Sequence, residues 1–134
     1  MPVYSKIILV DDDRDDIELF QSVIQETCPE VQLTVATNGE KLIYLLKEMP
    51  TPDIILLDLN MPIKDGKQCL AEIRAKTEYN DIAIAMYSTS GRKADIDYCL
   101  SNGANHYFVK PQTYTGLIAF VQNLCMENRS ALKC

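Results

Sequence analysis

The sequence has 134 residues, enough for one domain that buries about two thirds of the surface exposed by its unfolded chain. Hydrophobic residues make up 47% and charged residues 24%, as in an ordinary globular protein, which excludes a disordered or fibrous chain. The net charge of -6 argues against direct binding to nucleic acid, because phosphate backbones bind basic surfaces.

The five cysteines are odd in number, widely spaced and without a Cys-x-x-Cys pair. This pattern is typical of reduced thiols in a cytosolic protein, rather than of a disulfide framework or a zinc site. The sequence shows neither a secretory leader nor an apolar run long enough to span a membrane. We therefore expect a cytoplasmic protein without a membrane partner.

Apolar runs alternate with helical patterns along the first part of the chain. Residues 6–10 predict a buried strand, which ends in the acidic segment 11–13. A helix is predicted next, with an apolar face formed by Ile17, Phe20, Val23 and Ile24. Alternating apolar residues predict a second strand over 31–35, and a turn at 37–39 leads into a second helix.

The third predicted strand, residues 53–57, is an almost uninterrupted apolar run that ends at Asp58. Such a run is typical of a strand buried on both faces of a parallel sheet. The remaining elements are a helix from about 66 to 75–76, a strand over 81–87, a small-residue loop over 88–91, a helix over about 93–101, a strand over 105–109, and a last helix capped by Thr113. Five strands alternating with five helices predict an α/β domain with a doubly wound parallel sheet.

Polar residues follow four of these strands. In chain order, the strands end at Asp11 and Asp12, at Asp58, at Ser88 and Thr89, and at Lys110. Because parallel strands end at one edge of the sheet, we expect these side chains to converge. Asp58 alone fits a turn-capping carboxylate equally well. Clustered carboxylates, however, repel one another unless a hard cation such as Mg²⁺ lies between them. Together with a lysine and hydroxyl groups, this arrangement suits transfer of a phosphoryl group to Asp58.

Four segments at these strand ends resemble the receiver domain of two-component response regulators. They are Ile-Leu-Val-Asp-Asp-Asp (8–13), Leu-Leu-Asp-Leu-Asn-Met-Pro (56–62) with Asp65-Gly66, Tyr-Ser-Thr-Ser (87–90) and Tyr-Phe-Val-Lys-Pro (107–111). Each segment is short, but their order is specific, and the resemblance covers about residues 6–127. It implies a flavodoxin-like (βα)5 fold with strand order 2-1-3-4-5.

The resemblance also implies roles for the site residues. Asp58 is the expected phospho-acceptor, and Lys110 corresponds to the lysine that accompanies it. Ser88 is the expected switch hydroxyl, with Thr89 beside it. Tyr107 corresponds to the switching aromatic residue of the family.

A magnesium site is implied in the same way. Asp12 is the expected direct ligand, and Asp11 is expected to assist through water. Asp58 itself and the backbone carbonyl of Asn60 complete the implied ligand set. The peptide bond before Pro111 is expected to be cis, as it usually is in receivers.

The implied function is two-component phosphorelay signalling. A sensor histidine kinase or a histidine phosphotransfer protein phosphorylates Asp58, and phosphorylation switches a protein-interaction surface. The chain is then a signalling module and no enzyme, beyond its own phosphotransfer and slow autodephosphorylation. The downstream target stays open, and the fourth helix, fifth strand and fifth helix form a candidate homodimer surface.

The extent of the resemblance predicts a single receiver domain over residues 1–134. Only the short segment 126–134 follows it, so we expect no output domain, as in stand-alone receivers of the chemotaxis type. The acidic run 13–16 is similar to that of phytochrome-associated stand-alone regulators.

Other acidic and histidine residues have simpler interpretations. Asp13, Asp15 and Asp16 suit the positive end of a helix dipole better than they suit further metal ligands. His106 is the only histidine, and strand alternation points it away from Tyr107. We therefore expect no catalytic role for it.

Two other functions use similar residues. A small Mg²⁺-dependent phosphatase of the haloacid dehalogenase type also has an Asp nucleophile, but it needs a second acid where this chain has Asn60. A flavodoxin-like carrier needs a Ser/Thr/Gly-rich phosphate loop after its first strand. The aspartates at 11–13 would repel that phosphate.

Overall fold

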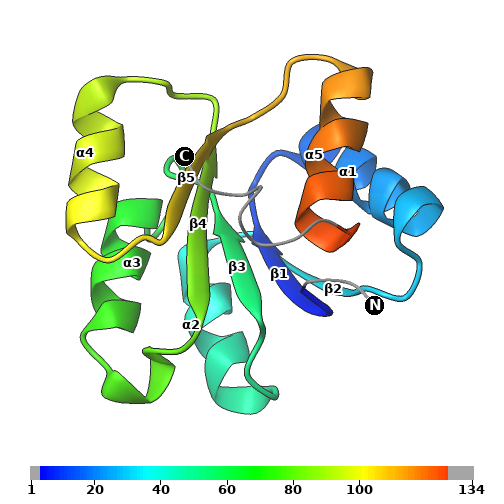
Figure 1. Cartoon of the computed structure of the whole chain (residues 1–134). Helices are drawn as coiled ribbons and strands as arrows, with labels where there is room; N and C mark the ends of the chain where they lie inside the picture. Colours follow the sequence, from blue (N-terminus) through cyan, green and yellow to red (C-terminus); the bar gives the residue numbers. More distant parts are fainter. Residues whose placement is uncertain (1–3, 127–134) are drawn as a thin grey trace.

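The computed structural model describes residues 4–126. A parallel sheet in the order β2-β1-β3-β4-β5 forms its centre (Figure 1). The strands are β1 (Lys6–Val10), β2 (Gln32–Ala36), β3 (Ile54–Leu57), β4 (Ala83–Ser88) and β5 (His106–Val109). The helices are α1 (Arg14–Thr27), α2 (Gly39–Glu48), α3 (Gly66–Arg74), α4 (Lys93–Ser101) and α5 (Tyr114–Met126), and a 3-10 helix (Thr77–Tyr79) precedes β4. The fold class and strand order predicted from the sequence are confirmed.

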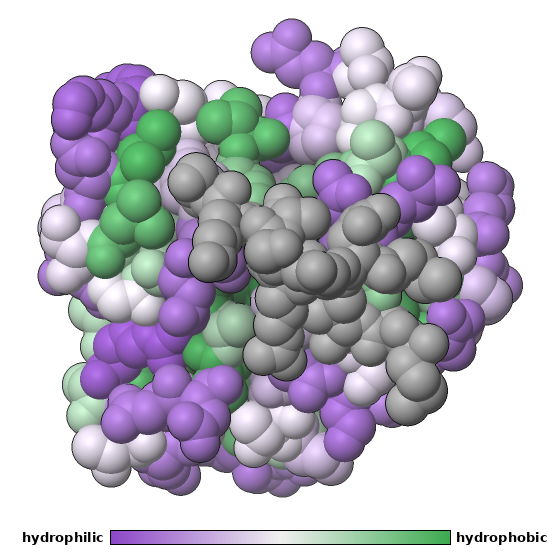
Figure 2. All heavy atoms as spheres, in the orientation of Figure 1, coloured by the Kyte–Doolittle hydropathy of each residue, from purple (hydrophilic) through white to green (hydrophobic). Residues whose placement is uncertain are grey.

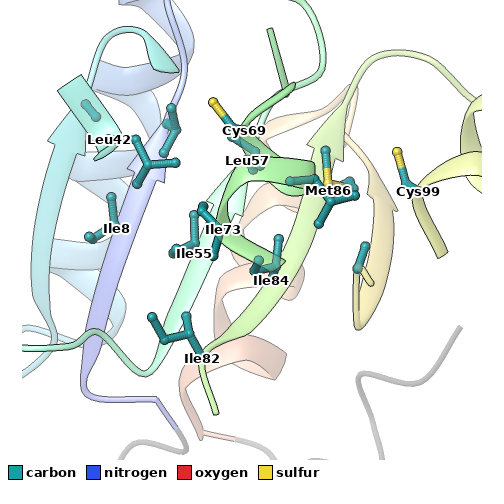
Figure 3. Packing of buried hydrophobic residues seen from close by; sticks show 14 of the residues in the cluster. Ile8, Leu42, Ile55, Leu57, Cys69, Ile73, Ile82, Ile84, Met86 and Cys99 are labelled. Carbon is teal, nitrogen blue, oxygen red and sulfur yellow. The ribbon is translucent and has the colours of Figure 1, made fainter. Parts of the chain in front are cut away.

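The sheet has a helical layer on each face, and strand alternation decides which side chains meet which layer (Figure 1). On one face, Ile8, Ile55 and Ile84 pack with residues of α2, α3 and α4 (Figure 3). On the other face, Ile7 and Leu56 pack with residues of α1 and α5. Neighbouring residues of one strand therefore belong to two separate cores.

β3 is the centre of the sheet, because it pairs with β1 on one side and with β4 on the other. All four of its side chains are fully buried. This agrees with the prediction of a strand covered on both faces. The backbone N–H of Asp58 donates to the carbonyl of Val10, at 3.0 Å. The hydrogen bonding between β3 and β1 therefore extends to Asp58.

Side chains at helix starts fix where the loops above the sheet turn. The carboxylate of Asp13 caps α1 by accepting a hydrogen bond from the N–H of Asp16. Asp65 and Gln68 form a capping box at the start of α3. The predicted cap at Thr113 is confirmed, since its hydroxyl accepts from the N–H of Gly116.

Two predictions differ from the structure. The Lys110–Pro111 peptide bond is trans, so the expected cis bond was wrong; bonds before proline favour trans by about 0.5–1 kcal/mol. The strand predicted from residue 81 begins at Ala83, because the N–H of Ile82 closes a turn onto Tyr79. Within the described part of the chain, no helix combines the length and hydrophobicity of a transmembrane span.

The start of α3 lies directly against the end of β3, and Gly66 allows this contact. A Cβ atom at this position would lie 2.2 Å from the carbonyl oxygen of Asp58 and 2.8 Å from the Cα of Leu59. Both atoms belong to the backbone, so neither can move aside without shifting the strand end. Gly66 therefore helps to fix the position of Asp58.

We predict that Gly66→Ala destabilises the protein by about 2–3 kcal/mol, because the added methyl forces the backbone apart. Urea unfolding followed by circular dichroism measures this change. Gly91→Ala is the control, since its Cβ would meet only Val109 Cγ2 at 3.6 Å, an ordinary contact. Equal stability of the two variants would contradict the proposed role of Gly66.

Candidate functional site

The residues predicted at the strand ends meet at one edge of the sheet. Asp11 follows β1, Asp58 follows β3, Ser88 ends β4 and Lys110 follows β5. All four side chains are buried, although each is polar or charged. Parallel strands bring these residues together, as the sequence predicts.

Lys110 lies among three carboxylates. Its Nζ is 2.7 Å from Asp11 Oδ2, 3.0 Å from Asp16 Oδ2 and 3.5 Å from Asp58 Oδ2. Burial acts to lower the pKa of Lys110, but the hydrogen bonds with Asp11 and Asp16 and the nearby negative charges raise it above its usual value. The ammonium therefore stays charged at neutral pH.

Asp58 has an unusual acidity for a carboxyl group. Burial raises its pKa to about 6, and the charge of Asp11 adds to this effect. The charge of Lys110 and a hydrogen bond from the backbone N–H of Asn60 act in the opposite direction. At neutral pH, Asp58 is mainly ionised, which a nucleophile requires.

Three carboxylates fit a divalent cation. One oxygen from each of Asp11, Asp12 and Asp58 lies within 4.8 Å of the others. Asp11 is buried and held by the N–H of Asp13 at 3.0 Å, whereas Asp12 is exposed. Hard oxygen donors at this spacing, partly open to water, suit Mg²⁺, which usually keeps several water ligands. The carbonyl of Asn60 as a further ligand remains a prediction.

The two hydroxyl residues at the end of β4 differ in exposure. Ser88 is fully buried, and its Oγ accepts a hydrogen bond from the N–H of Ser90 at 3.2 Å. Thr89 is exposed and, with Asn60, lines a cleft of about 540 Å³ between this loop and the start of α3. In this conformation, the Ser88 hydroxyl is hydrogen-bonded within its own loop, and Thr89 lines the cleft.

Tyr107 points inward below the same loop. Its side chain is buried, and its hydroxyl donates to the carbonyl of Ser90 at 2.7 Å. Burial raises its pKa, while hydrogen bonds with Ser90 and Ser88 act to lower it. His106 points to the opposite face, where its ring stacks on Phe108, as strand alternation predicts. Ser88 and Tyr107 are thus linked through one short loop.

Two acidic residues of this region have contacts that the sequence analysis missed. Asp16 was expected only to begin α1, but it binds Lys110. It precedes the buried Phe20 by one helical turn, so the spacing could have indicated an inward position. Asp15, by contrast, is exposed, as expected.

Asp95 is the second such residue. It is buried in the first turn of α4, and it accepts hydrogen bonds from Ser90 Oγ at 2.7 Å and Lys67 Nζ at 3.0 Å. Arg92 also donates to it, at 3.2 Å. Hydrogen bonds from Ser90, Lys67 and Arg92 hold its pKa well below the usual range. The carboxylate therefore ties the loop after β4 to α3.

Comparison with known proteins agrees with this geometry. The family pattern of the response regulator receiver domain matches residues 7–122. Response regulator Rcp1 of Synechocystis is 30% identical over 124 residues, which cover 88% of this chain and 84% of Rcp1.

Two solved structures are similar over nearly the whole chain. The Mn²⁺-bound form of Rcp1 has a TM-score of 0.80 at 30% identity and covers 89% of this chain and 90% of its own. The phosphorylated cyanobacterial phytochrome response regulator RcpA has a TM-score of 0.80 at 29% identity, with coverages of 91% and 94%. The matched segment includes every strand end described above, and the chain accordingly belongs to the response regulator receiver domain family.

Proposed function

We propose that the protein is a phospho-receiver that accepts a phosphoryl group on Asp58 from a phosphohistidine. The donor is a sensor histidine kinase or a histidine phosphotransfer protein. One observation carries this proposal: an ionised, buried Asp58 lies 3.5 Å from a lysine ammonium and within 4.8 Å of the carboxylates of Asp11 and Asp12. A carboxylate with only a structural role would not need a lysine ammonium and two further carboxylates beside it.

The reaction is an in-line displacement at phosphorus. A carboxylate oxygen of Asp58 forms the new O–P bond as the N–P bond to the donor imidazole breaks and the imidazole leaves with the electron pair. Lys110 neutralises negative charge on the transferring group, and the exposed Thr89 offers a hydroxyl from the cleft.

A bound Mg²⁺ would supply further neutralisation of the phosphoryl oxygens. Asp11, Asp12 and Asp58 are the residues that would hold it. The Mn²⁺-bound state of Rcp1 supports a divalent cation in this family, and the phosphorylated state of RcpA supports the phospho-acceptor role.

The phosphatase alternative is weaker on chemical grounds. A haloacid dehalogenase needs a second carboxylic acid near the nucleophile to protonate the leaving group, and the amide of Asn60 cannot donate that proton. A receiver that takes its phosphoryl group from a phosphohistidine needs no such acid, because the leaving group is an imidazole and not an alkoxide. We therefore favour the signalling module over the phosphatase, and we propose that it acts in the cytoplasm.

We further propose that Ser88 and Tyr107 transmit phosphorylation to the surface formed by α4, β5 and α5. Ser88 turns its hydroxyl from the N–H of Ser90 to the phosphoryl oxygens, which releases the loop to which Tyr107 is bonded. Tyr107 then changes its contacts with the loop and with α4.

This surface suits a protein partner, either a second copy of the chain or a downstream target. Apolar atoms reach the surface beside α4 and near the end of β5, among polar residues (Figure 2). The exposed apolar residues there include Leu100 and Val109. Isolated apolar side chains within a polar surface are usual for reversible interfaces.

We predict that Asp58→Asn abolishes phosphorylation, because its amide oxygen is a poor nucleophile. Wild-type protein incubated with acetyl phosphate and Mg²⁺ should gain one phosphoryl group by intact mass spectrometry, and a chelator should prevent it. Asp97→Asn is the matched control, since Asp97 is exposed on α4 and pairs with Lys93. Undiminished labelling of Asp58→Asn would assign the acceptor to another residue.

We predict that Ser88→Ala still accepts the phosphoryl group but loses the response at Tyr107. NMR spectra of tyrosine side chains, recorded with and without beryllofluoride and Mg²⁺, should show a Tyr107 shift in the wild type and little in the variant. Ser22→Ala, at an exposed position of α1, should behave like the wild type. A full Tyr107 response in Ser88→Ala would refute the switch.

A further inference from the structure

Lys110 is shared between the site and helix α1. Its ammonium has three N–H donors, and three different carboxylates lie around it. The distance to Asp16 is 3.0 Å, whereas that to the acceptor Asp58 is 3.5 Å. In this state, the ammonium is therefore bonded more closely to α1 than to Asp58.

Asp16 differs from the other two carboxylates in its position. Asp11 and Asp58 belong to the group of oxygens that could hold a cation, and Asp16 does not. Its side chain is 42% exposed, while those of Asp11 and Asp58 are almost fully buried. Within residues 4–126, the hydrogen bond from the Lys110 ammonium is the one contact that connects the Asp16 side chain to the site.

We propose that Asp16 is a positioning residue that competes with the phosphoryl group for Lys110. The proposal rests on the phospho-acceptor role of Asp58. In the resting state, Asp16 holds the ammonium toward α1, and in the phosphorylated state the same ammonium must turn to the phosphoryl oxygens. Asp16 thereby weakens the phosphorylated state relative to the resting state.

Charge supports this competition. Phosphorylation replaces a carboxylate of charge -1 by a phosphoryl group with about one further negative charge at neutral pH. The negative charge of Asp16 repels the phosphoryl group. Lys110 carries a single positive charge, so an ammonium that is bonded to both groups compensates each of them only in part. The exposed position of Asp16 lets water replace Lys110 when the ammonium turns away.

The test compares Asp16→Asn with Asp15→Asn. Both residues lie in the first turn of α1, so each variant removes the same charge from the same end of the helix dipole. Asp15 is exposed, and the ion pairs of Lys110 with residues 4–126 are those with Asp11, Asp16 and Asp58, so Asp15 is not among them. Asp15→Asn therefore reproduces the loss of charge without the loss of the Lys110 contact.

Affinity for beryllofluoride at saturating Mg²⁺, measured by NMR titration, gives the main result. We expect Asp16→Asn to bind it about fivefold more tightly than the wild type, which corresponds to about 1 kcal/mol, and Asp15→Asn to differ by less than about twofold. Equal gains in both variants would overturn the competition in favour of general charge repulsion. Weaker binding by Asp16→Asn would also overturn it, because Asp16 would then orient Lys110 for phosphoryl binding.

Titration with Mg²⁺ alone is the second readout. Loss of Asp16 removes a negative charge and lets Lys110 move toward Asp11 and Asp58, so the affinity for the metal should stay equal or fall. Tighter Mg²⁺ binding by Asp16→Asn would contradict the proposal. If the wild type bound no beryllofluoride at all, the phospho-acceptor function itself would fail; failure of the Asp16 inference alone leaves wild-type binding intact.

Discussion

The positive charge of Lys110 is the condition on which the rest of the site depends. Burying a carboxylate costs several kcal/mol unless an opposite charge or hydrogen bonds compensate it. Asp11 and Asp58 are both buried, and Lys110 is the cation that contacts both. Even with this compensation, burial raises the pKa of Asp58 to about 6, so the ionised form of this carboxyl group stays costly. A divalent cation held by Asp11, Asp12 and Asp58 would stabilise that ionised form.

The sheet supplies the rigidity that this charge arrangement needs. β3 is buried on both faces and hydrogen-bonded on both sides. The close approach of Gly66 to the carbonyl of Asp58 fixes the position of this residue, which follows β3. The loop after β4 has a different kind of support. Hydrogen bonds from Ser90 to Asp95 and from Tyr107 to Ser90 hold it, and such bonds can exchange partners. A fixed Asp58 beside a loop that can exchange its hydrogen bonds suits the two-state switch that we propose.

Sequence patterns were sufficient where a single element, or the shared edge of parallel strands, determined the outcome. The apolar run of β3 predicted its burial and the edge position of Asp58, and strand alternation predicted the opposite directions of His106 and Tyr107. Contacts of helix side chains with other elements were not visible in this way. Asp95 and Lys67 are 28 residues apart, and each alone resembles an ordinary surface charge on a helix. Asp16 suited the helix dipole so well that its bond to Lys110 was missed. The isomer of the bond before Pro111 depends on the folded surroundings and was expected wrongly.

The separation of the core into two faces has a consequence for how the protein can evolve. Lys110 contacts α1 through Asp16, on the face that α1 and α5 cover, whereas Tyr107 belongs to the core that α3 and α4 share. Asp58, the proposed acceptor, follows β3, whose side chains alternate between these two cores. Substitutions in α1 can therefore change the charge around Lys110 while the packing beneath α4 stays the same. Likewise, substitutions beneath α4 can change the packing while the charge around Lys110 stays the same. Under the proposed function, the charge around Asp58 and the contacts of the α4 surface can therefore change independently among descendants of one ancestral chain.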